Sequence, residues 1–158
     1  MAELTIRPLA APEAVAAGAR MMAASDPWIT LGRGEAACRA LLERPGLEAY
    51  GAWWQGGLVG VLVLNLQGPF PGYLQAICVD PTHRSRGLGA DLVAFAEARV
   101  FQEHPNVFLC VSGFNARARA FYARLGYREV GELPDFVVAG QSEVLLRKTR
   151  GPRDGYRP

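Results

Sequence analysis

Apolar and polar positions alternate in some parts of this chain and recur at helical spacing in others. Alternating or continuous apolar runs rich in β-branched and aromatic residues predict strands at residues 3–9, 47–54, 58–66, 73–79, 106–112, 127–133 and 142–148. Helical spacing or an alanine-rich run predicts helices at 12–24, 34–43 and 87–104. A fourth helix is predicted between Asn115, a natural N-cap, and Gly126, which ends it.

The predicted element order is β-α-α-β-β-β-α-β-α-β-β. Gln55-Gly56-Gly57 separates two strands and predicts a tight hairpin. A meander followed by a β-α-β crossover predicts an α/β (α+β) fold, with a mixed and mostly antiparallel sheet of about seven strands flanked by about four helices. Parallel strands joined by a helix leave a crevice at their carboxyl ends, where ligands bind in open sheets.

The composition describes an ordinary globular chain. Its 158 residues are 50% hydrophobic and 20% charged, which fits one domain and excludes a wholly disordered or coiled-coil chain. The longest apolar run, residues 58–66, is far shorter than a membrane helix, and the first residues do not resemble a signal peptide. Three distant cysteines, Cys38, Cys78 and Cys110, indicate neither disulfides nor a metal site, so we expect a cytoplasmic protein.

Positive charge is concentrated at the end of the chain. The last twelve residues hold five basic side chains against one acidic, a charge of +4, whereas the remaining body has 12 basic against 14 acidic residues, a charge of −2. We therefore expect one domain over residues 1–148 and a basic, disordered tail over 149–158. The total charge of +2 makes nucleic acid an unexpected partner.

The segment from Val79 to Ala90 has the composition of an anion site. A strand end and a turn lead to Gly87 and Gly89, which open the predicted long helix, and Arg84 and Arg86 stand just before them. Glycines let an anion approach the backbone, and the free N–H groups and dipole of a helix start favour negative charge. The pattern is neither a Rossmann fingerprint nor a P-loop. It indicates a phosphate or pyrophosphate cradle, with a merely structural turn as the alternative.

The segment from Asn115 to Tyr127 places a tyrosine on the inner face of a helix. Ala118, Phe121, Tyr122 and Leu125 form its apolar stripe. By itself this pattern is also explained by capping and by a core tyrosine with a hydrogen-bonded hydroxyl.

Together, these two segments resemble the GCN5-related N-acetyltransferase (GNAT) superfamily. Its first signature, [R/Q]-x-x-G-x-[G/A], is met by residues 84–89. Its second, N-x-x-A-x-x-F-Y-x-x-x-G-[F/Y], is met by residues 115–127. The separation of the two motifs and the predicted order of strands also match that superfamily. The resemblance covers roughly residues 3–148.

The resemblance implies an enzyme that binds acetyl-CoA and passes the acetyl group to an amine by direct attack in a ternary complex. It implies that the loop and helix start hold the pyrophosphate and that residues 77–79 splay from the next strand to bond the pantetheine. Tyr122 would be the catalytic acid that protonates the departing thiolate. The implied cofactor-binding residues are Ile77, Cys78, Val79, Arg84, Ser85, Arg86, Gly87, Leu88, Gly89, Ala90, Asn115 and Tyr122.

The general base is left open. A lysine-like amine must lose a proton before it attacks, which at pH 7 costs about 4–5 kcal/mol. Relatives that acetylate ribosomal protein N-termini use a glutamate where Cys110 stands here, and a buried thiol is a poor base. Asp26, Glu48, Asp135 or a chain of waters are the alternatives.

The resemblance places the acceptor pocket between the first two helices and at the last strand connection. Asp26, Trp28, Asp135 and Phe136 are the candidate substrate-binding residues: two carboxylates to attract a cation and two aromatic walls. Ordinary loop anchoring explains the aromatics equally well. Trp53 and Trp54, adjacent on one strand, must face opposite sides of the sheet.

Two functions remain. The first is an acetyl-CoA-dependent N-acetyltransferase acting on a primary amine of a small molecule, peptide or protein; the second is a non-catalytic CoA-binding or sensing module of the same fold. Acetyl-CoA and an amine acceptor are the expected partners, with no membrane and no metal. Pairing of sheets between two copies would give a homodimer.

Overall fold

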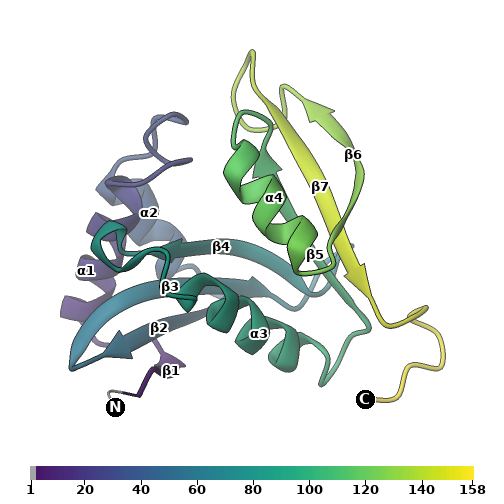
Figure 1. The fold of residues 1–158 in the computed structure, drawn as a ribbon, viewed down its shortest axis with the longest axis horizontal. Helices are drawn as coiled ribbons and strands as arrows, with labels where there is room; N and C mark the ends of the chain where they lie inside the picture. Colours follow the sequence, from purple (N-terminus) through teal and green to yellow (C-terminus); the bar gives the residue numbers. More distant parts are fainter. Residues whose placement is uncertain (1–2) are drawn as a thin grey trace.

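The computed structural model describes residues 3–158. Its strands are β1 (Thr5–Pro8), β2 (Glu48–Trp54), β3 (Gly57–Asn65), β4 (Tyr73–Val79), β5 (Asn106–Ser112), β6 (Arg128–Pro134) and β7 (Ser142–Thr149). Its helices are α1 (Pro12–Ala23), α2 (Glu35–Leu42), α3 (Leu88–Val100) and α4 (Ala116–Arg124), with a short 3₁₀ turn, Pro81–His83, before α3. Every predicted element is present, in the predicted order (Figure 1).

Helix α3 is shorter than the sequence pattern predicts. It ends at Val100, whereas the pattern continues to residue 104. The chain leaves the helix in a turn in which the N–H of His104 bonds the carbonyl of Val100, and the His104 ring bonds the carbonyl of Leu66 at 3.0 Å. This contact with the end of β3 competes with one further helical turn.

The seven strands form one mixed sheet, as predicted, and their order in the sheet is β1-β2-β3-β4-β5-β7-β6. All neighbours are antiparallel except β4 and β5, which are parallel and register only at Tyr73 and Phe108. Beyond that pair the two strands diverge, and Figure 1 shows β5 and β7 running steeply away from β4. The sheet is therefore split at the carboxyl end of β4.

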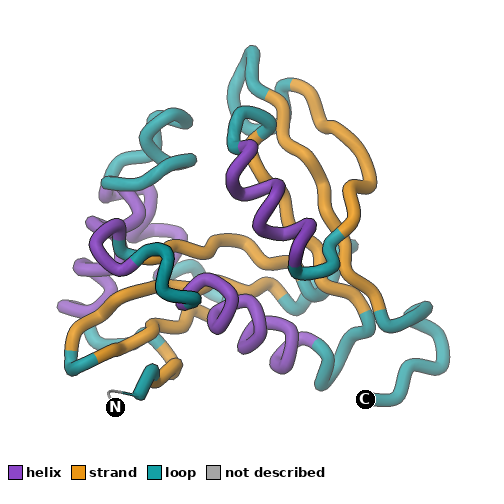
Figure 2. Tube along the Cα trace, viewed as in Figure 1, coloured by secondary structure: helices purple, strands orange, loops and turns teal. Residues whose placement is uncertain are grey.

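The helices form two layers, one on each face of the sheet (Figure 2). Helices α3 and α4 pack on one face over a core that includes Leu62, Leu92 and Leu109. Helices α1 and α2 pack on the other face over a core that includes Met22, Leu42 and Val61. The residues of β3 alternate between these cores, which explains why its sequence is apolar throughout.

A bulge in β4 reverses which side chains face which helix layer. Val63 registers with Ala76 and Leu64 with Leu74, so Gln75 is an extra residue in β4. Leu74 therefore belongs to the α3 and α4 core, whereas Ala76, two residues later, belongs to the α1 and α2 core. The bulge lies at the start of the split between β4 and β5.

The adjacent residues Trp53 and Trp54 face opposite sides of the sheet, as predicted. Trp53 packs on the α1 and α2 core and Trp54 on the α3 and α4 core. The guanidinium of Arg7 lies 4.3 Å from the centre of the Trp53 ring, and that of Arg86 lies 5.1 Å from the centre of the Trp54 ring. Each tryptophan is thus held between a core and an arginine.

The last residues contact the domain where the sequence analysis expects disorder. The Arg150 N–H donates to the Pro105 carbonyl at 2.8 Å, and its guanidinium lies 4.0 Å from the centre of the Phe101 ring. The Tyr156 hydroxyl donates to the Phe101 carbonyl at 2.6 Å. All three contacts are made to the connection between α3 and β5. Within residues 3–158, no helix has the length and apolar character needed to cross a membrane.

Candidate active site

The connection from β4 to α3 builds a helix start with free N–H groups. Its first intrahelical hydrogen bond runs from Asp91 N–H to Gly87 O, at 3.1 Å. The N–H groups of Leu88, Gly89 and Ala90 therefore have no acceptor within the helix. Gly87 has a φ of 84° and open space where a Cβ would stand. Backbone donors and open space at a helix N-terminus suit a phosphate group.

A cavity of about 540 Å³ opens in front of this helix start. It is bounded by the end of β4, the connection to α3, the start of α4 and the segment after α1. Ten of the twelve predicted cofactor-binding residues line it: Ile77, Cys78, Val79, Arg84, Ser85, Gly87, Leu88, Gly89, Ala90 and Asn115. We call it the loop cavity.

The side chain of Cys78 points away from the loop cavity and towards α1. Its thiol is buried in the α1 and α2 core and lies 3.8 Å from the Met21 carbonyl oxygen. Burial raises the pKa of this thiol. Only the main chain of Cys78 is available to a ligand, which is the role that the resemblance implied for it.

Three arginines give the loop cavity its positive charge. Arg84 is oriented by hydrogen bonds to the Ser25 hydroxyl at 3.0 Å and to the Val79 carbonyl at 3.3 Å. Arg117 and Arg124, on α4, also line the cavity, and Arg117 bonds the Ser85 hydroxyl at 3.3 Å. The sequence analysis missed these last two. Their spacing of seven residues, which places both on one helix face, was the signal that could have found them.

Arg86 does not line the loop cavity, although the sequence analysis expected it to hold phosphate. Its guanidinium stacks on Trp54 instead. In the same turn, His83 bonds Asp80 at 3.3 Å, and Asp80 accepts the N–H of Thr82 at 2.8 Å. Arg86 and Asp80 thus hold the connection in shape, one from each end.

A smaller cavity, of about 150 Å³, adjoins the loop cavity at the split between β4 and β5. The two cavities share walls, namely Asp26, Trp28, Ile77, Asn115 and Ala118. The smaller one alone is lined by Tyr122, Cys110, Ser112 and Glu143. We call it the split cavity.

Tyr122 reaches the split cavity from α4. Its side chain is 4% exposed and packs edge-on against Phe121 and Tyr127, with ring centres 5.0 and 5.4 Å away. Among residues 3–158, no hydrogen-bond partner is found for its hydroxyl, whereas Tyr127 donates to Glu97 at 3.1 Å. Burial raises the pKa of Tyr122 far above neutral pH, so the phenol keeps its proton. Asn115 caps α4 as predicted, accepting the Ala118 N–H at 3.1 Å.

The structure separates the four predicted acceptor residues into two pairs. Asp26 and Trp28 line both cavities. Asp135 and Phe136 line neither, because they lie in the connection from β6 to β7. There the Asp135 carboxylate accepts the Gly140 N–H at 2.6 Å and stabilises the turn, and Phe136 is 59% exposed.

Of the predicted base candidates, Glu48 lies outside both cavities. It pairs with Arg99 at 2.8 Å and accepts the Tyr50 hydroxyl at 2.6 Å. Cys110 does line the split cavity, but burial raises the pKa of its thiol, which leaves it neutral. The sequence analysis missed Glu143, which is 5% exposed in the same cavity. A charged residue inside the apolar pattern of β7 was the available signal.

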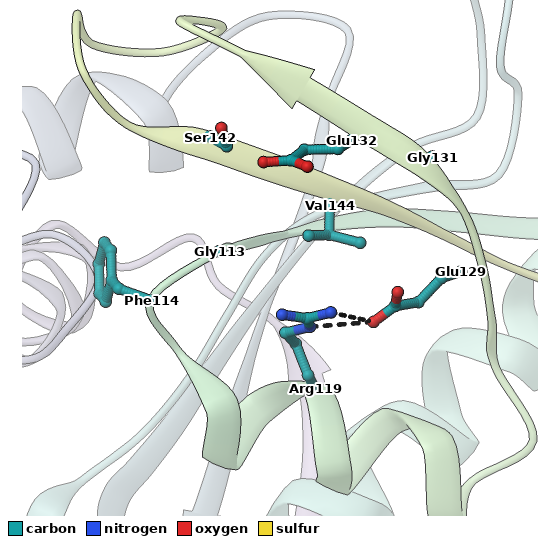
Figure 3. Close-up of a pocket in the computed structure, with 8 residues that line it drawn as sticks. All are labelled: Gly113, Phe114, Arg119, Glu129, Gly131, Glu132, Ser142 and Val144. Carbon is teal, nitrogen blue, oxygen red and sulfur yellow. Dashed lines mark hydrogen bonds and ion pairs between the residues drawn. The ribbon is translucent and has the colours of Figure 1, made fainter.

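A third cavity, of about 300 Å³, lies beside β6 and β7 and contains none of the predicted site residues (Figure 3). Two of its charged side chains are engaged with each other: Arg119 on α4 bonds Glu129 at 2.7 Å. Glu132 projects into it from β6. These residues provide matched controls for the other two cavities.

The chain belongs to the acetyltransferase (GNAT) family, whose model matches residues 18–127. Over 120 residues it is 32% identical to blasticidin-S acetyltransferase of Streptomyces morookaense, and the match covers 71% of this chain and 88% of that protein. It is 30% identical over 137 residues to N-alpha-acetyltransferase RimI of Mycobacterium tuberculosis, covering 84% of this chain and 82% of that one.

The fold is also that of solved acetyltransferases. The structure of an aminoglycoside 6′-N-acetyltransferase complexed with coenzyme A superposes with a TM-score of 0.75 at 18% identity, and the match covers 98% of this chain and 99% of that one.

Proposed function

We propose that this protein transfers the acetyl group of acetyl-CoA to a primary amine, and that both substrates meet at Tyr122. The observation that carries the proposal is the pair of adjoining cavities. One has a helix start and three arginines, and the other contains a buried, protonated tyrosine. Family membership supports the acetyl donor, as does the coenzyme A held by the solved aminoglycoside 6′-N-acetyltransferase.

The residues of the loop cavity fit the phosphates of coenzyme A. The free N–H groups of Leu88, Gly89 and Ala90 would donate to the pyrophosphate, and Arg84 and Arg117 would add charged donors. A Cβ at Gly89 would lie 3.3 Å from the Phe121 ring, so this glycine also lets α3 and α4 approach each other closely. Acetyl-CoA supplies the activated acetyl group, as a thioester.

The split of the sheet suits the rest of that cosubstrate. Because β4 and β5 register only at Tyr73 and Phe108, the β4 edge from Ile77 to Val79 is not paired with β5. Its main-chain groups would bond an extended pantetheine arm, much as an added strand does. A main-chain N–H aimed at the thioester oxygen would stabilise the negative charge that develops there.

Tyr122 would protonate the departing thiolate. A phenol that stays protonated can donate to the departing thiolate. Because the thiol, with a pKa of about 8.5, is a stronger acid than the phenol, the transfer is completed when the positively charged nitrogen of the adduct returns a proton to Tyr122. A buried tyrosine without a hydrogen-bond partner among residues 3–158 has a donor to spare. This feature favours an enzyme over a module that only binds coenzyme A.

The test is an acetylation screen that follows free CoA thiol. The acceptors are blasticidin S, an aminoglycoside with a 6′-amine, and a peptide with a free N-terminal amine, which are the acceptor types named for the relatives. We expect thiol release that depends on one of these amines. Binding of acetyl-CoA with no release above the rate of spontaneous hydrolysis for any of them would favour the binding module.

A further inference from the structure

Glu143 is a buried carboxylate for which the fold itself gives little support. It is 5% exposed on β7, and its Oε1 accepts the Ser112 hydroxyl at 2.9 Å. Within residues 3–158, no arginine, lysine or histidine forms an ion pair with it. Burying a carboxylate without a cation is costly, so such groups are rare in a core that serves packing alone.

Strand register places Glu143 on the acceptor side of the split. Glu143 pairs with Ser112 on β5, so both side chains share one face of the sheet, and Cys110 lies two residues before Ser112 on that same face. The neighbouring Val144 belongs to the α3 and α4 core on the opposite face. Glu143 therefore enters the split cavity from the side of α1 and α2, whereas Tyr122 enters it from α4.

The charges lining the two cavities are opposite. The loop cavity has three arginines against one carboxylate, Asp26 on the shared wall. The charged side chains lining the split cavity within residues 3–158 are Asp26 and Glu143. A phosphate group is thus attracted to the first and an ammonium group to the second. The split cavity has the composition of a site for a cation, and that cation would stand close to Tyr122.

Apart from Asp26, two titratable groups near Glu143 stay neutral. Tyr73 on β4 and Cys110 on β5 are coupled to it electrostatically, and burial raises the pKa of both. Burial also raises the pKa of Glu143, against the lowering effect of the Ser112 hydrogen bond. When it is ionised, a carboxylate with a raised pKa is a better proton acceptor than a free one.

We propose that Glu143 binds the ammonium group of the acceptor and takes its proton, so that the acceptor is an amine that arrives as a cation. This inference rests on the proposed acetyl transfer. The ammonium loses one proton to the Glu143 carboxylate, which later passes it to water. The freed nitrogen lone pair forms the C–N bond, the C–S bond breaks, and the thiolate takes the Tyr122 proton. The second proton of the nitrogen returns Tyr122 to its phenol form.

The variant that tests this is Glu143→Gln, since glutamine keeps the shape and can still accept the Ser112 hydroxyl. The matched control is Glu132→Gln, which removes a carboxylate from the third cavity on the neighbouring strand. With the best acceptor among the three amines of the screen, we expect kcat/KM at pH 7 to fall about 100-fold or more in Glu143→Gln, the range for a lost general base. The dissociation constant of acetyl-CoA stays within twofold, and Glu132→Gln stays near wild type.

The pH profile separates a base from a merely structural residue. Wild-type kcat/KM rises through the raised pKa of Glu143, because the carboxyl must be ionised to accept a proton, and is then level until the amine itself titrates. In Glu143→Gln, turnover depends instead on the fraction of the acceptor that is already the free amine. Its kcat/KM therefore rises about tenfold per pH unit up to the amine pKa, near 10 for a lysine-like acceptor, and the gap to wild type closes there.

The outcomes are distinct. A constant ratio between wild type and Glu143→Gln at every pH, or an unchanged kcat/KM, overturns the role of Glu143 while leaving acetyl transfer intact. If wild type acetylates none of the three amines, the proposed function fails. Calorimetric titration of the same amines into the CoA-loaded protein then decides the ammonium site, because equal binding by wild type and Glu143→Gln overturns it, whereas weaker binding by the variant supports it.

Discussion

The loop cavity and the split cavity share a wall, yet they carry opposite charge and are built in different ways. The loop cavity combines main-chain groups, from one helix start and the unpaired edge of β4, with three arginines. The split cavity is made of side chains that come from both faces of the sheet. The difference teaches that an anion shared by a whole family can be held by backbone, whereas an acceptor particular to one protein is selected by side chains.

Tyr122 lines the split cavity one helical turn after Ala118, which belongs to the wall shared by the two cavities. Its hydroxyl has a large expected effect on catalysis. In Tyr122→Phe, we expect kcat to fall about 100-fold, because the thiolate must leave without a proton donor. Acetyl-CoA should still bind within twofold of wild type, since the loop cavity is unchanged. Steady-state kinetics and calorimetry measure the two quantities.

Tyr127→Phe is the matched control for this variant. Tyr127 is as buried as Tyr122 and packs against it, but it lies in neither cavity and donates to Glu97. The Tyr127→Phe variant should keep the kcat of the wild type. Equal losses in both variants would mean that the aromatic cluster acts through packing alone.

The arginines of α4 sharpen the comparison on the side of the loop cavity. In Arg117→Gln and Arg124→Gln, we expect the dissociation constant of acetyl-CoA to rise about threefold to tenfold each, the effect of one exposed charge-assisted contact. Added salt should narrow the gap, because exposed charges are screened. Arg119→Gln, on the same helix but paired with Glu129, should bind acetyl-CoA as wild type does.

Asp26 sharpens the comparison on the side of the acceptor. In Asp26→Asn, we expect the KM of a cationic acceptor to rise a few-fold, within the range of about 1 kcal/mol that exposed ion pairs contribute. Asp135→Asn should leave that KM unchanged, because the Asp135 carboxylate bonds the Gly140 N–H and lies in neither cavity. A larger effect at Asp135 than at Asp26 would move the acceptor to the connection between β6 and β7.

Arg86 has the smallest expected effect. The guanidinium of Arg86 stacks on Trp54 and does not line the loop cavity. Arg86→Ala therefore removes only an exposed cation–π contact of about 0.5 kcal/mol that holds the connection. We expect the dissociation constant of acetyl-CoA to change by less than about twofold. A loss of tenfold or more would place Arg86 among the groups that hold phosphate.

The helices, the strands and the two motifs could be predicted from the sequence, because local patterns of residues encode them. The alternation of apolar residues predicted the strands, and the Gly87-Leu88-Gly89 and Asn115 motifs predicted a helix start and a capped helix at the crossover. These features depend on neighbours in the chain. The family resemblance then implied cofactor-binding residues, ten of which line the loop cavity.

What the sequence did not predict depends on contacts between distant segments. Glu143 lies in the split cavity because β7 is placed between β5 and β6 in the sheet, and because Glu143 registers with Ser112 of β5. Arg86 is drawn to Trp54, which comes from β2, and Asp135 is used within its own turn. No local pattern encodes such choices. The bulge at Gln75, which sets the facing of Cys78, is likewise visible only in the register of β3 and β4.

The central claim, that opposite charges sort two substrates to two sides of Tyr122, is tested most directly by calorimetric titration of acetyl-CoA into two double variants. Arg117→Gln/Arg124→Gln removes charge from the loop cavity, and Asp26→Asn/Glu143→Gln removes it from the split cavity. The account predicts at least tenfold weaker binding in the first, and unchanged or tighter binding in the second. Equal binding by the two double variants, or weaker binding by the second, would contradict it.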